Sequence, residues 1–561
     1  MDKAFPKKNR AHLLATLPLH QKGVPVLNIK KLLQLPSHSQ ECLANAQEAV
    51  LFLSDPSLYV KPDSKIRAPK MADRLLREME GYKFGPLPPG VKGKAGVLAF
   101  PVIEKEDTRL RAIQAPDLNE VNVAPSVAFP PKWVVDKHSV PLLKASGKKQ
   151  KAKRRRGSNW TTVQFDLAAW FDQFGLGDEL RPYFCMLVAG KEVALHRLPM
   201  GLRHAVYIAQ SALWQLLNFP KRAMVDTTID NVRFTGMEDD VVADAIAFLR
   251  RCAVVGATLN VVGCPDINAT PKDLRKLVVD LLEPKFGDFL GTTYLYDSAE
   301  KKNQEKTVRK LSFLRDAVAT SGPLSRRQVA TVFGVLFYAA SVVRAPLAPY
   351  YNALRYLRKV SAMGGDDWDQ LACSMPSLAR EQLLAWLDFL IANKPVPIIE
   401  VEEEPRFVVI TDASGEGWGA ISVDTTTGSI MEFSFPWTGL DVPRAESSVW
   451  AEPEAIFLAV CRIASPGDAV LVLTDHQPAE FANESGYAKS WSLNQLVARM
   501  HRLPGVRVTI RHIPGKGNPA DGLSRTIGSS LTGEEQQCAR TLAAGAWGKR
   551  VRIDTRLDWQ V

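Results

Sequence analysis

An apolar run that ends in a carboxylate constrains the fold of this chain more than any other feature. In WTTVQFDLAAWFDQF, Asp166 follows Val163 and Phe165. Such a run of apolar and β-branched residues predicts that Asp166 lies at the mouth of a buried strand. A later stretch, AMVDTTIDNVRFTG, has two short β-prone runs around Asp230 and Asn231. Asp and Asn tolerate the backbone angles of tight turns, so this stretch predicts a hairpin with Asp230 at its tip.

Two acidic residues at neighbouring strand ends are suited to holding metal ions. Hard cations such as Mg2+ need oxygen ligands, and a pair of carboxylates is the usual protein contribution to a two-metal phosphoryl-transfer site. Between the two acids lies RLPMGLRHAVYIAQSALWQLL, in which a Pro-Gly turn leads into a helical pattern. The order of strand acid, Pro-Gly-helix and hairpin acid is far more specific than two carboxylates alone.

This order resembles the palm of retroelement reverse transcriptases, most closely those of LTR and DIRS-type retrotransposons. FDLAAWF resembles the first palm motif of that family, and LPMGL followed by Gln210 resembles the second. The third motif, usually Tyr-x-Asp-Asp, is Thr-Ile-Asp-Asn here and ends in Asp230 and Asn231. The resemblance implies that Asp166 and Asp230 hold two Mg2+ (or Mn2+) ions.

The same resemblance implies a substrate site around the metals. Gly201 would leave room for the template–nucleotide pair, and Gln210 would belong to the same substrate-binding set. Phe171, five residues after Asp166, would be the steric gate, because its aromatic face would clash with a 2′-hydroxyl on the sugar. The expected product is therefore DNA.

Residues 96–135 alternate apolar and charged residues, which predicts a hairpin whose basic side chains are free to contact a triphosphate. Residues 117–119, Asp-Leu-Asn, resemble a signature that follows the fingers hairpin of the same family. On that match Arg111, Arg109 and Lys105 are the candidates to neutralise the phosphates of a dNTP, for which Arg offers two-pronged contacts. The alternative is a solvated, charged strand face.

Residues 144–156, KASGKKQKAKRRR, form a basic run without apolar partners. Three explanations stay open from the sequence. The run could contact the template backbone, act as a nuclear-import signal or form a solvated surface loop.

Two departures from the family pattern bear on activity. Asn231 stands where the second acid of the third motif is expected, and Gly263 stands where family members often have a lysine that helps the pyrophosphate to leave. Asn keeps an oxygen but removes a charge, so metal affinity should fall without vanishing. Lys272, Lys276 or Lys285 would have to replace the missing lysine.

Other segments predict helices and a further hairpin. Helical patterns cover residues 29–35 and 41–53, and FGDFLGTTYLYD, residues 286–297, resembles the primer-grip hairpin of the family. Ser325 and Gln328 have the spacing of a capping box, so a helix should begin there and contain the apolar run 329–343. REQLLAWLDFLIANKP predicts another helix, with Trp386 in its core.

A second acidic set occupies the last third of the chain. Asp412 ends a β-branched strand, RFVVITD; Glu452 lies in a helical segment; Asp475 ends the strand AVLVLTD; and Asp521 begins a helix after GKGNPA. Four carboxylates at the ends of separate elements of one α/β layer suit a two-metal nuclease, since one ion serves the attacking water and the other the leaving 3′-oxygen.

The contexts TDASGEGWGA and HIPGKGNPADGLSR resemble the ribonuclease H domain of the same elements. Glu452 is preferred to Glu454 because the family spacing, Glu-x-x-Ala, fits Glu452 and Ala455. An aspartic protease is excluded at Asp412, because no Thr or Ser follows the Asp directly.

Composition indicates the class of protein. The 561 residues, 46% hydrophobic and 23% charged, are enough for several globular domains. The net charge of +11 favours a polyanionic partner. Seven cysteines without CxxC spacing argue against a disulfide framework or zinc knuckle. No secretory signal is visible and the longest apolar run is too short to cross a bilayer. We therefore expect an intracellular protein without a membrane partner, nuclear or cytoplasmic.

These observations predict a mixed α/β and α+β multidomain chain, with a right-hand polymerase of fingers, palm and thumb, a connection and a ribonuclease H-like α/β domain. The expected activity is RNA-directed DNA polymerisation coupled to ribonuclease H cleavage. Its partners would be an RNA template, a DNA primer, RNA–DNA hybrid, dNTPs and other proteins of the element. There are two alternatives. One is a degenerate or domesticated descendant that serves as a nucleic-acid-binding or assembly platform, with or without nuclease activity, and the other is a nuclease that works alone.

The expected boundaries are 1–95 for an N-terminal extension without an assigned role, 96–300 for fingers and palm, 301–345 for the thumb, 346–404 for the connection, 405–530 for the nuclease and 531–561 for a tail.

Overall fold

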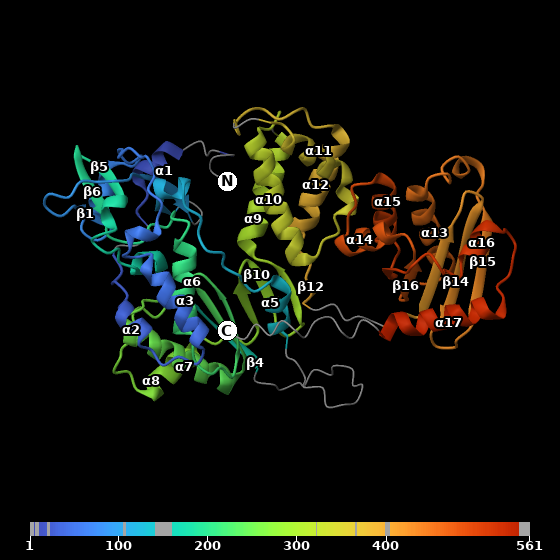
Figure 1. Cartoon of the computed structure of the whole chain (residues 1–561), viewed down its shortest axis with the longest axis horizontal. Helices are drawn as coiled ribbons and strands as arrows, with labels where there is room; N and C mark the ends of the chain where they lie inside the picture. Colours follow the sequence, from blue (N-terminus) through green and yellow to red (C-terminus); the bar gives the residue numbers. More distant parts are fainter. Residues whose placement is uncertain are drawn as a thin grey trace. The chain divides into compact units, whose positions relative to one another are not determined.

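The computed structural model describes residues 5, 10–19, 23–104, 108–140, 160–320, 322–364, 367–398 and 404–548. These residues form two compact units, and Figure 1 shows the helices and strands of both. The first unit contains the described residues up to Lys301, together with Pro397 and Ile398. The second contains the described residues from Lys302 to Val396 and from 404 onward.

A three-stranded antiparallel sheet in the order β4-β8-β7 lies at the centre of the first unit. Phe165 of β4 and Phe234 of β8 alternate with polar residues and pack on Phe248 of α7, with ring centroids 5.6 and 5.9 Å apart. The helices α6 and α7 contribute to the same hydrophobic core. The bounds are β4 (Trp160–Asp166), β7 (Met224–Thr228), β8 (Asn231–Met237), α6 (Ala205–Leu216) and α7 (Glu238–Val255).

The N-terminal segment belongs to this core. Leu32, Leu53, Met79 and Phe84 are buried in the same cluster as the central sheet, so the described part of residues 1–95 shares its core with the rest of the first unit. The helices predicted around residues 29–35 and 41–53 are present. Sequence reasoning missed their packing because the apolar residues that dock them follow no motif. The helices are α1 (Arg10–Thr16), α2 (Ile29–Leu33), α3 (Gln40–Leu51) and α4 (Asp73–Met79).

The chain forms other sheets besides the central one. The predicted hairpin between residues 96 and 135 is formed by β2 and β3, with Glu104 opposite Arg109 at its end. The hairpin predicted over 286–297 is formed by β9 and β10. β9 and β10 belong to a four-stranded sheet in the order β12-β11-β10-β9, and a three-stranded sheet has the order β1-β6-β5. The bounds are β1 (Phe84–Pro86), β2 (Val97–Glu104), β3 (Arg109–Pro116), α5 (Lys132–His138), β5 (Cys185–Val188), β6 (Lys191–Leu195), α8 (Pro271–Asp280), β9 (Phe286–Phe289), β10 (Thr292–Leu295), β11 (Glu300–Asn303) and β12 (Val396–Pro397).

Four helices begin the second unit. The predicted capping box is present: Ser325 Oγ accepts from the backbone N–H of Gln328 at 3.2 Å, and Gln328 Oε1 accepts from that of Ser325 at 2.8 Å. Trp386 is fully buried, as predicted, and stacks on Tyr350 with centroids 4.8 Å apart. The helices are α9 (Glu305–Thr320), α10 (Arg326–Val343), α11 (Tyr351–Ser361) and α12 (Ser377–Ile391).

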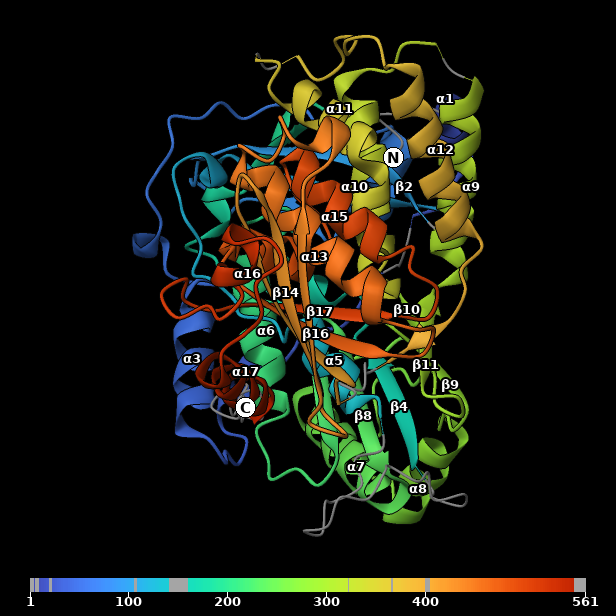
Figure 2. The same ribbon diagram turned by 90° about the vertical axis from the view of Figure 1, so that its right-hand side faces the viewer.

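A five-stranded mixed sheet in the order β15-β14-β13-β16-β17 forms the rest of the second unit. β13, β16 and β17 are parallel, and β14 and β15 continue the sheet antiparallel. Alternate residues of β13 pack into two cores, one shared with α13 and α15 and the other with α16 and α17. These four helices are labelled near the strands β14 and β16 in Figures 1 and 2. The bounds are β13 (Phe407–Ala413), β14 (Gly417–Asp424), β15 (Ile430–Pro436), α13 (Ser448–Ile463), β16 (Ala469–Thr474), α14 (Gln477–Ser485), α15 (Trp491–Met500), β17 (Arg507–His512), α16 (Asp521–Arg525) and α17 (Gly533–Gly548).

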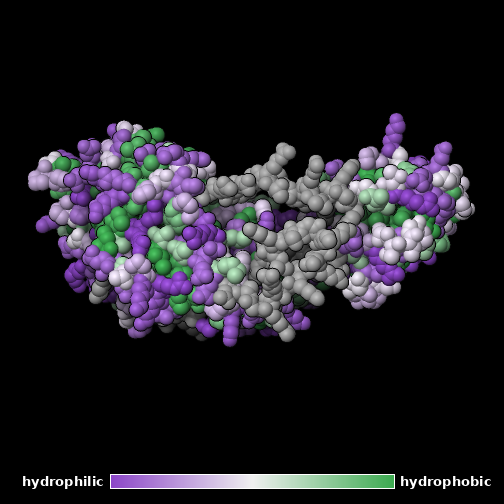
Figure 3. Space-filling view, turned by 90° about the horizontal axis from the view of Figure 1, so that it is seen from below, coloured by the Kyte–Doolittle hydropathy of each residue, from purple (hydrophilic) through white to green (hydrophobic). Residues whose placement is uncertain are grey.

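The prediction of a mixed α/β multidomain chain is confirmed. Within the segment that was expected to be a tail, Leu531, Ala539 and Ala543 are buried against the mixed sheet. All seven cysteines are free. None of the helices in the described ranges is both long and apolar enough to cross a membrane. On the face seen in Figure 3 the surface is mostly hydrophilic, and its hydrophobic residues lie in small patches.

Candidate functional site

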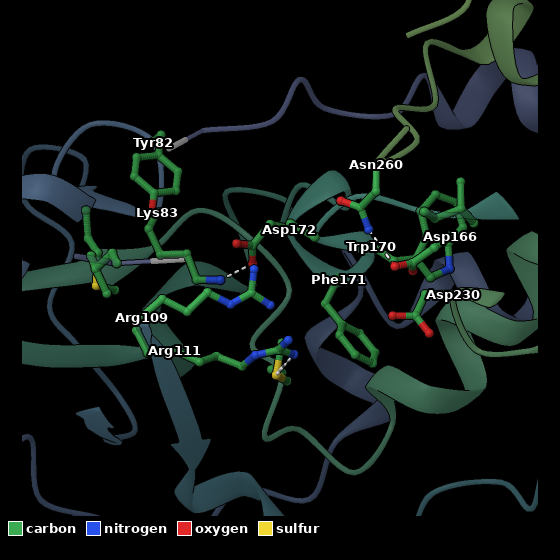
Figure 4. Close-up of a pocket in the computed structure, with 16 residues that line it drawn as sticks. Tyr82, Lys83, Arg109, Arg111, Asp166, Trp170, Phe171, Asp172, Asp230 and Asn260 are labelled. Carbon is green, nitrogen blue, oxygen red and sulfur yellow. Dashed lines mark hydrogen bonds and ion pairs between the residues drawn. The ribbon is translucent and has the colours of Figure 1, made fainter. Parts of the chain in front are cut away.

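The first candidate site lies where β4 ends beside the turn of the β7–β8 hairpin. Asp166, the last residue of β4, pairs with Asn231, and the turn consists of Ile229 and Asp230. The backbone N–H of Leu167 donates to the carbonyl of Asp230 at 2.8 Å, which ties the turn to the strand. The two carboxylates line the same cavity and lie next to each other (Figure 4).

The charges of the two acids affect each other. Burial, and then the charge of Asp166, raise the pKa of Asp230 to about 6. The Asn231 amide opposes this rise, because its Nδ2 donates to Asp230 Oδ1 at 2.8 Å. Asn260 Nδ2 donates to Asp166 Oδ2 at 2.6 Å. A divalent cation between the carboxylates would remove the remaining repulsion, because an opposite charge favours their ionised form.

Gln210 supports the turn from behind. Its side chain is fully buried on α6, where Oε1 accepts from the backbone N–H of Ile229 at 2.6 Å and Nε2 donates to Thr227 Oγ1 at 3.1 Å. Ile229 has a φ of +56°, a left-handed conformation that is costly for a β-branched residue. The structure therefore places Gln210 outside the cavity, where it holds the backbone next to Asp230.

A cavity of about 370 Å3 opens in front of the two acids. Segments that are distant in the sequence form it: the end of the N-terminal segment, the β2–β3 hairpin, the loop after β4 and the Pro-Gly turn. Three of the predicted substrate-binding residues, Arg109, Arg111 and Phe171, line this cavity with the acids. The other lining residues include Met79, Tyr82, Lys83, Trp170, Asp172, Met200 and Asn260.

Both arginines of the β2–β3 hairpin are already paired. Arg111 Nε lies 2.5 Å from Glu104 Oε1, and Arg109 Nη2 lies 3.4 Å from Glu104 Oε2. Burial lowers the pKa of Arg109, and the negative charge of Asp166 opposes this change. The positive charge of Arg111 lowers the pKa of Asp230. Lys105, the third candidate, lies outside the described residues, as does the basic run 144–156.

Sequence reasoning missed a buried ion pair beside the predicted steric gate. Lys83, whose exposed fraction is 4%, pairs with Asp172, the residue after Phe171. Arg197 Nη1 also donates to the backbone carbonyl of Asp172 at 3.3 Å. The Phe171 ring points into the space between Arg111 and the acids (Figure 4). A single lysine in a segment without recognised motifs gives no signal in the sequence.

The local backbone structure explains why glycine occupies two positions that the sequence analysis singled out. A Cβ at Gly201 would come within 2.3 Å of the Gln114 carbonyl oxygen, so the Pro-Gly turn can lie against β3 only with glycine there. Gly263 has a φ of +73° and exchanges two backbone hydrogen bonds of 2.9 Å with Leu259. A lysine would be strained at this position. The proposed replacements, Lys272, Lys276 and Lys285, do not line the cavity among the described residues.

The second candidate site lies at the ends of β13 and β16 and on α13. Asp412 is near the end of β13, Asp475 follows β16, and Glu452 is on the helix that covers this side of the sheet. One oxygen from each of the three carboxylates lies within 4.8 Å of the others. Parallel pairing of β13 with β16 produces this arrangement, because it places both strand ends at one edge.

Crowding and burial perturb these acids strongly. Burial, then the charges of Asp412 and Asp475, raise the pKa of Glu452 to about 8. Burial also raises the pKa of Asp412 to about 6, although Ser524 Oγ donates to its Oδ2 at 2.5 Å. Glu452 Oε2 is buried and has no hydrogen-bond partner among the described residues. Three oxygen donors with an unpartnered buried oxygen fit Mg2+ or Mn2+, which bind carboxylates.

The fourth predicted acid stands slightly apart. The charge of Asp521 raises the pKa values of Asp412 and Glu452. Asp521 is not one of the three clustered acids, and its Oδ1 accepts a hydrogen bond from Arg525 Nε at 2.8 Å. Glu454 binds Arg499 with both oxygens, at 2.5 and 2.8 Å. The structure therefore brings Glu452, and not Glu454, to the other acids.

Comparisons with known proteins find similarity only at the level of solved structures. No protein-family model and no curated protein matches the chain. The chain is similar to a foamy viral protease-reverse transcriptase in complex with double-stranded DNA, with 12% identity, a TM-score of 0.44, and coverage of 89% of this chain and 99% of that chain.

A dRH form of that protein in complex with double-stranded DNA gives 12% identity and a TM-score of 0.42, over 89% of this chain and 85% of that one. A complex with RNA/DNA hybrid gives the same identity and TM-score over 92% of this chain and 66% of that one. At these values the similarity does not establish an activity.

Proposed function

We propose that this chain is an RNA-directed DNA polymerase of an LTR or DIRS-type retroelement, with a second site that cleaves the RNA strand of RNA–DNA hybrids. The observation that carries the proposal is the meeting of Asp166 and Asp230 in a cavity whose walls also hold Arg109, Arg111 and Phe171. In this assignment residues 96–300 are fingers and palm, 301–345 the thumb, 346–404 the connection and 405–530 the core of the nuclease.

The first site would carry out nucleotide transfer. The 3′-hydroxyl of a primer forms a bond to the α-phosphorus of a dNTP, and the bond to pyrophosphate breaks. Arg109 and Arg111 bind the triphosphate in place of Glu104, since a polyphosphate carries more negative charge than one carboxylate. Phe171 lies against the sugar. Two Mg2+ ions, when bound at either site, activate the attacking oxygen and stabilise the departing one.

The second site would hydrolyse the template after copying. Asp412, Glu452 and Asp475 would hold the metals, and Asp521 adds negative charge beside them. Ser524 and Asn518 fix the Asp412 carboxylate through hydrogen bonds of 2.5 and 3.3 Å. Water attacks the phosphodiester, and the 3′-oxygen of the cleaved RNA leaves.

A second candidate function is a nucleic-acid-binding or assembly platform without polymerase activity. It is favoured by Asn231, which leaves two carboxylates at the first site where the family motif would supply three. In this case the first site would bind nucleic acid or nucleotide without turnover, with or without cleavage at the second site.

Primer extension on an RNA template with Mg2+ and dNTPs, and cleavage of a labelled RNA–DNA hybrid, test the proposal. Wild type should do both. Asp166→Ala should lose extension and keep cleavage, and Asp475→Asn should show the opposite. Asp178→Ala is the control, because its side chain is 74% exposed and lies outside both sites.

Two results would decide against the polymerase. Wild type that incorporates no dNTP, with Asp166→Ala behaving identically, favours the platform. Hybrid cleavage that Asp475→Asn abolishes, in the absence of any extension, identifies a nuclease that works alone.

A further inference from the structure

A fully buried ion pair lies on the two strands that carry the Asp230 turn. Asp226 of β7 and Arg233 of β8 are cross-strand partners, and the side chains of both have an exposed fraction of 0%. Arg233 Nη2 and Nε donate to Asp226 Oδ2 at 2.6 and 3.2 Å. Neither side chain lines the cavity. The proposed chemistry therefore leaves this pair without a role.

The Arg233 guanidinium is also held by a second hairpin. Its carbon lies 4.6 Å from the centroid of the Phe289 ring on β9 and 4.9 Å from that of Tyr294 on β10. Stacking of a planar cation on aromatic faces is attractive, and more so away from water. The guanidinium thus joins the β7–β8 hairpin to the β9–β10 hairpin.

Helix α5 closes the same cluster from another side. Arg233 Nη2 donates to the carbonyl of Val135 at 3.1 Å, and His138 Nδ1 lies 2.8 Å from Asp226 Oδ1. Asp136 of α5 pairs with the buried Lys301, and it accepts from the Tyr294 hydroxyl at 3.0 Å. Three elements therefore meet at Arg233 and its partners.

Stability alone is a weak explanation for such a cluster. Removing two charges from water is costly, and well-packed apolar residues often serve equally well in place of a buried ion pair. The planar fork of arginine, in contrast, fixes direction: it binds a carboxylate and a carbonyl and stacks on two rings in one geometry. Such a contact suits a function that depends on the position of one hairpin relative to the other.

We infer that Arg233 is a positioning residue that fixes the β9–β10 hairpin relative to the Asp230 turn, so that a primer end held by β9–β10 faces the metal site. This inference rests on the proposed polymerase function and on the resemblance of residues 286–297 to a primer-grip hairpin. Arg233 lies three residues after Asp230 on the strand that leaves the turn. A shift of β9–β10 against that strand changes the distance between the primer end and the metals.

Arg233→Lys tests the inference, because lysine keeps the charge beside Asp226 but lacks the planar fork. Arg251→Lys is the matched control. Arg251 is also buried, donates to the carbonyls of Pro36 and Gln215 at 2.7 Å, and does not line the cavity. Asp226→Asn/Arg233→Met, which removes both charges, is the second variant if the single substitution folds poorly.

Two measurements are made on all variants. The first is kcat and KM for single-nucleotide extension. Arg233→Lys should lower kcat by about 10- to 100-fold, since small misplacement of reacting groups is costly, with KM for dNTP nearly unchanged. The second is amide hydrogen exchange in the free protein, which should become faster in residues 286–295 and stay unchanged in the mixed sheet. Arg251→Lys should change neither kcat nor exchange in 286–295.

The outcomes are distinguishable. Unchanged exchange in residues 286–295 overturns the coupling itself. Faster exchange there with an unchanged kcat overturns the positioning of the primer. A fall in kcat that Arg251→Lys reproduces shows a general effect of destabilisation and also overturns it. Wild type that does not extend primers overturns the proposed function, and with it the role at a primer end, whatever the exchange shows.

Discussion

The two acidic sites of this chain hold their carboxylates in different ways. At the first, Asp166 and Asp230 each accept a hydrogen bond from an asparagine amide and share a cavity with two arginines. At the second, three carboxylates crowd within 4.8 Å, with a buried oxygen of Glu452 that has no hydrogen-bond partner in the described part of the chain.

This difference leads us to expect different conditions for metal binding at the two sites. The second site already has three convergent oxygens, and the repulsion among them makes it strongly attractive to a divalent cation. The first site offers two carboxylates, so a metal there needs further oxygens from a triphosphate, as is usual for Mg2+ in nucleotide-transferring enzymes. We therefore expect the second site to bind Mg2+ in the free protein and the first to bind it together with its nucleotide.

Removing one acid from each site should give the largest changes in rate and should show directly how the two sites differ. Asp230→Asn leaves one carboxylate at the first site, and primer extension should fall by roughly 1,000-fold or more, since metal ions contribute several kcal/mol of charge stabilisation. Glu452→Gln leaves two clustered acids, and hybrid cleavage should fall less and recover partly at high Mg2+ concentration. Rates measured across a Mg2+ titration check both.

Equal losses of rate in the two variants, with equal recovery by Mg2+, would show that the two sites do not differ in metal binding. Asp178→Ala, an exposed carboxylate outside both sites, should change neither rate.

Binding of Mg2+ without nucleotide should stabilise the protein through the second site, and more strongly at pH 8 than at pH 6. Folding raises the pKa of Asp412 to about 6 and that of Glu452 to about 8, above their ordinary values. The folded metal-free protein thus keeps protons that the unfolded chain has lost. Its stability falls as the pH rises from about 4 through 8. Mg2+ requires the ionised form, so its effect grows over the same range.

Calorimetric unfolding at pH 6 and pH 8, with and without Mg2+, measures this effect. At a concentration 100 times the Kd the expected gain is about 2.7 kcal/mol. Glu452→Gln should remove most of the gain and make the metal-free protein more stable at pH 8. A Mg2+ effect that survives in Glu452→Gln but disappears in Asp230→Asn would reverse the assignment of the free-protein site.

The sequence predicted the backbone of both sites better than their surroundings. Strand ends and turns follow local patterns, so the places of Asp166, Asp230, Asp412 and Asp475 could be predicted from runs of apolar residues. The helix that brings Glu452 to the sheet could be chosen only through a family spacing.

Contacts between distant segments were not predictable in the same way. Lys83 reaches Asp172 across 89 positions, and Arg233 is fully buried although its sequence context is that of an ordinary charged strand residue. Packing decides these contacts, and no local pattern records it. The same holds for Gln210, whose amide supports the turn instead of lining the cavity.

Asn231→Asp restores the missing acid at the first site and should change the rate of extension least. The direction of the change tests how the two acidic sites differ. In Asn231→Asp a carboxylate replaces an amide that donates to Asp230 at 2.8 Å and lowers its pKa. The change adds a like charge and removes a donor, so the pKa of Asp230 should rise above about 6. Extension by the variant should therefore fall at pH 6 and need more Mg2+ there.

At pH 8 with high Mg2+ the third carboxylate becomes a metal ligand. Extension should then rise within one order of magnitude, because each kcal/mol of added metal binding is worth about five-fold. The variant would thus make the first site resemble the second, with a steeper dependence on pH and metal. A pH profile identical to that of the wild type would mean that residue 231 does not act on the metal-holding acids.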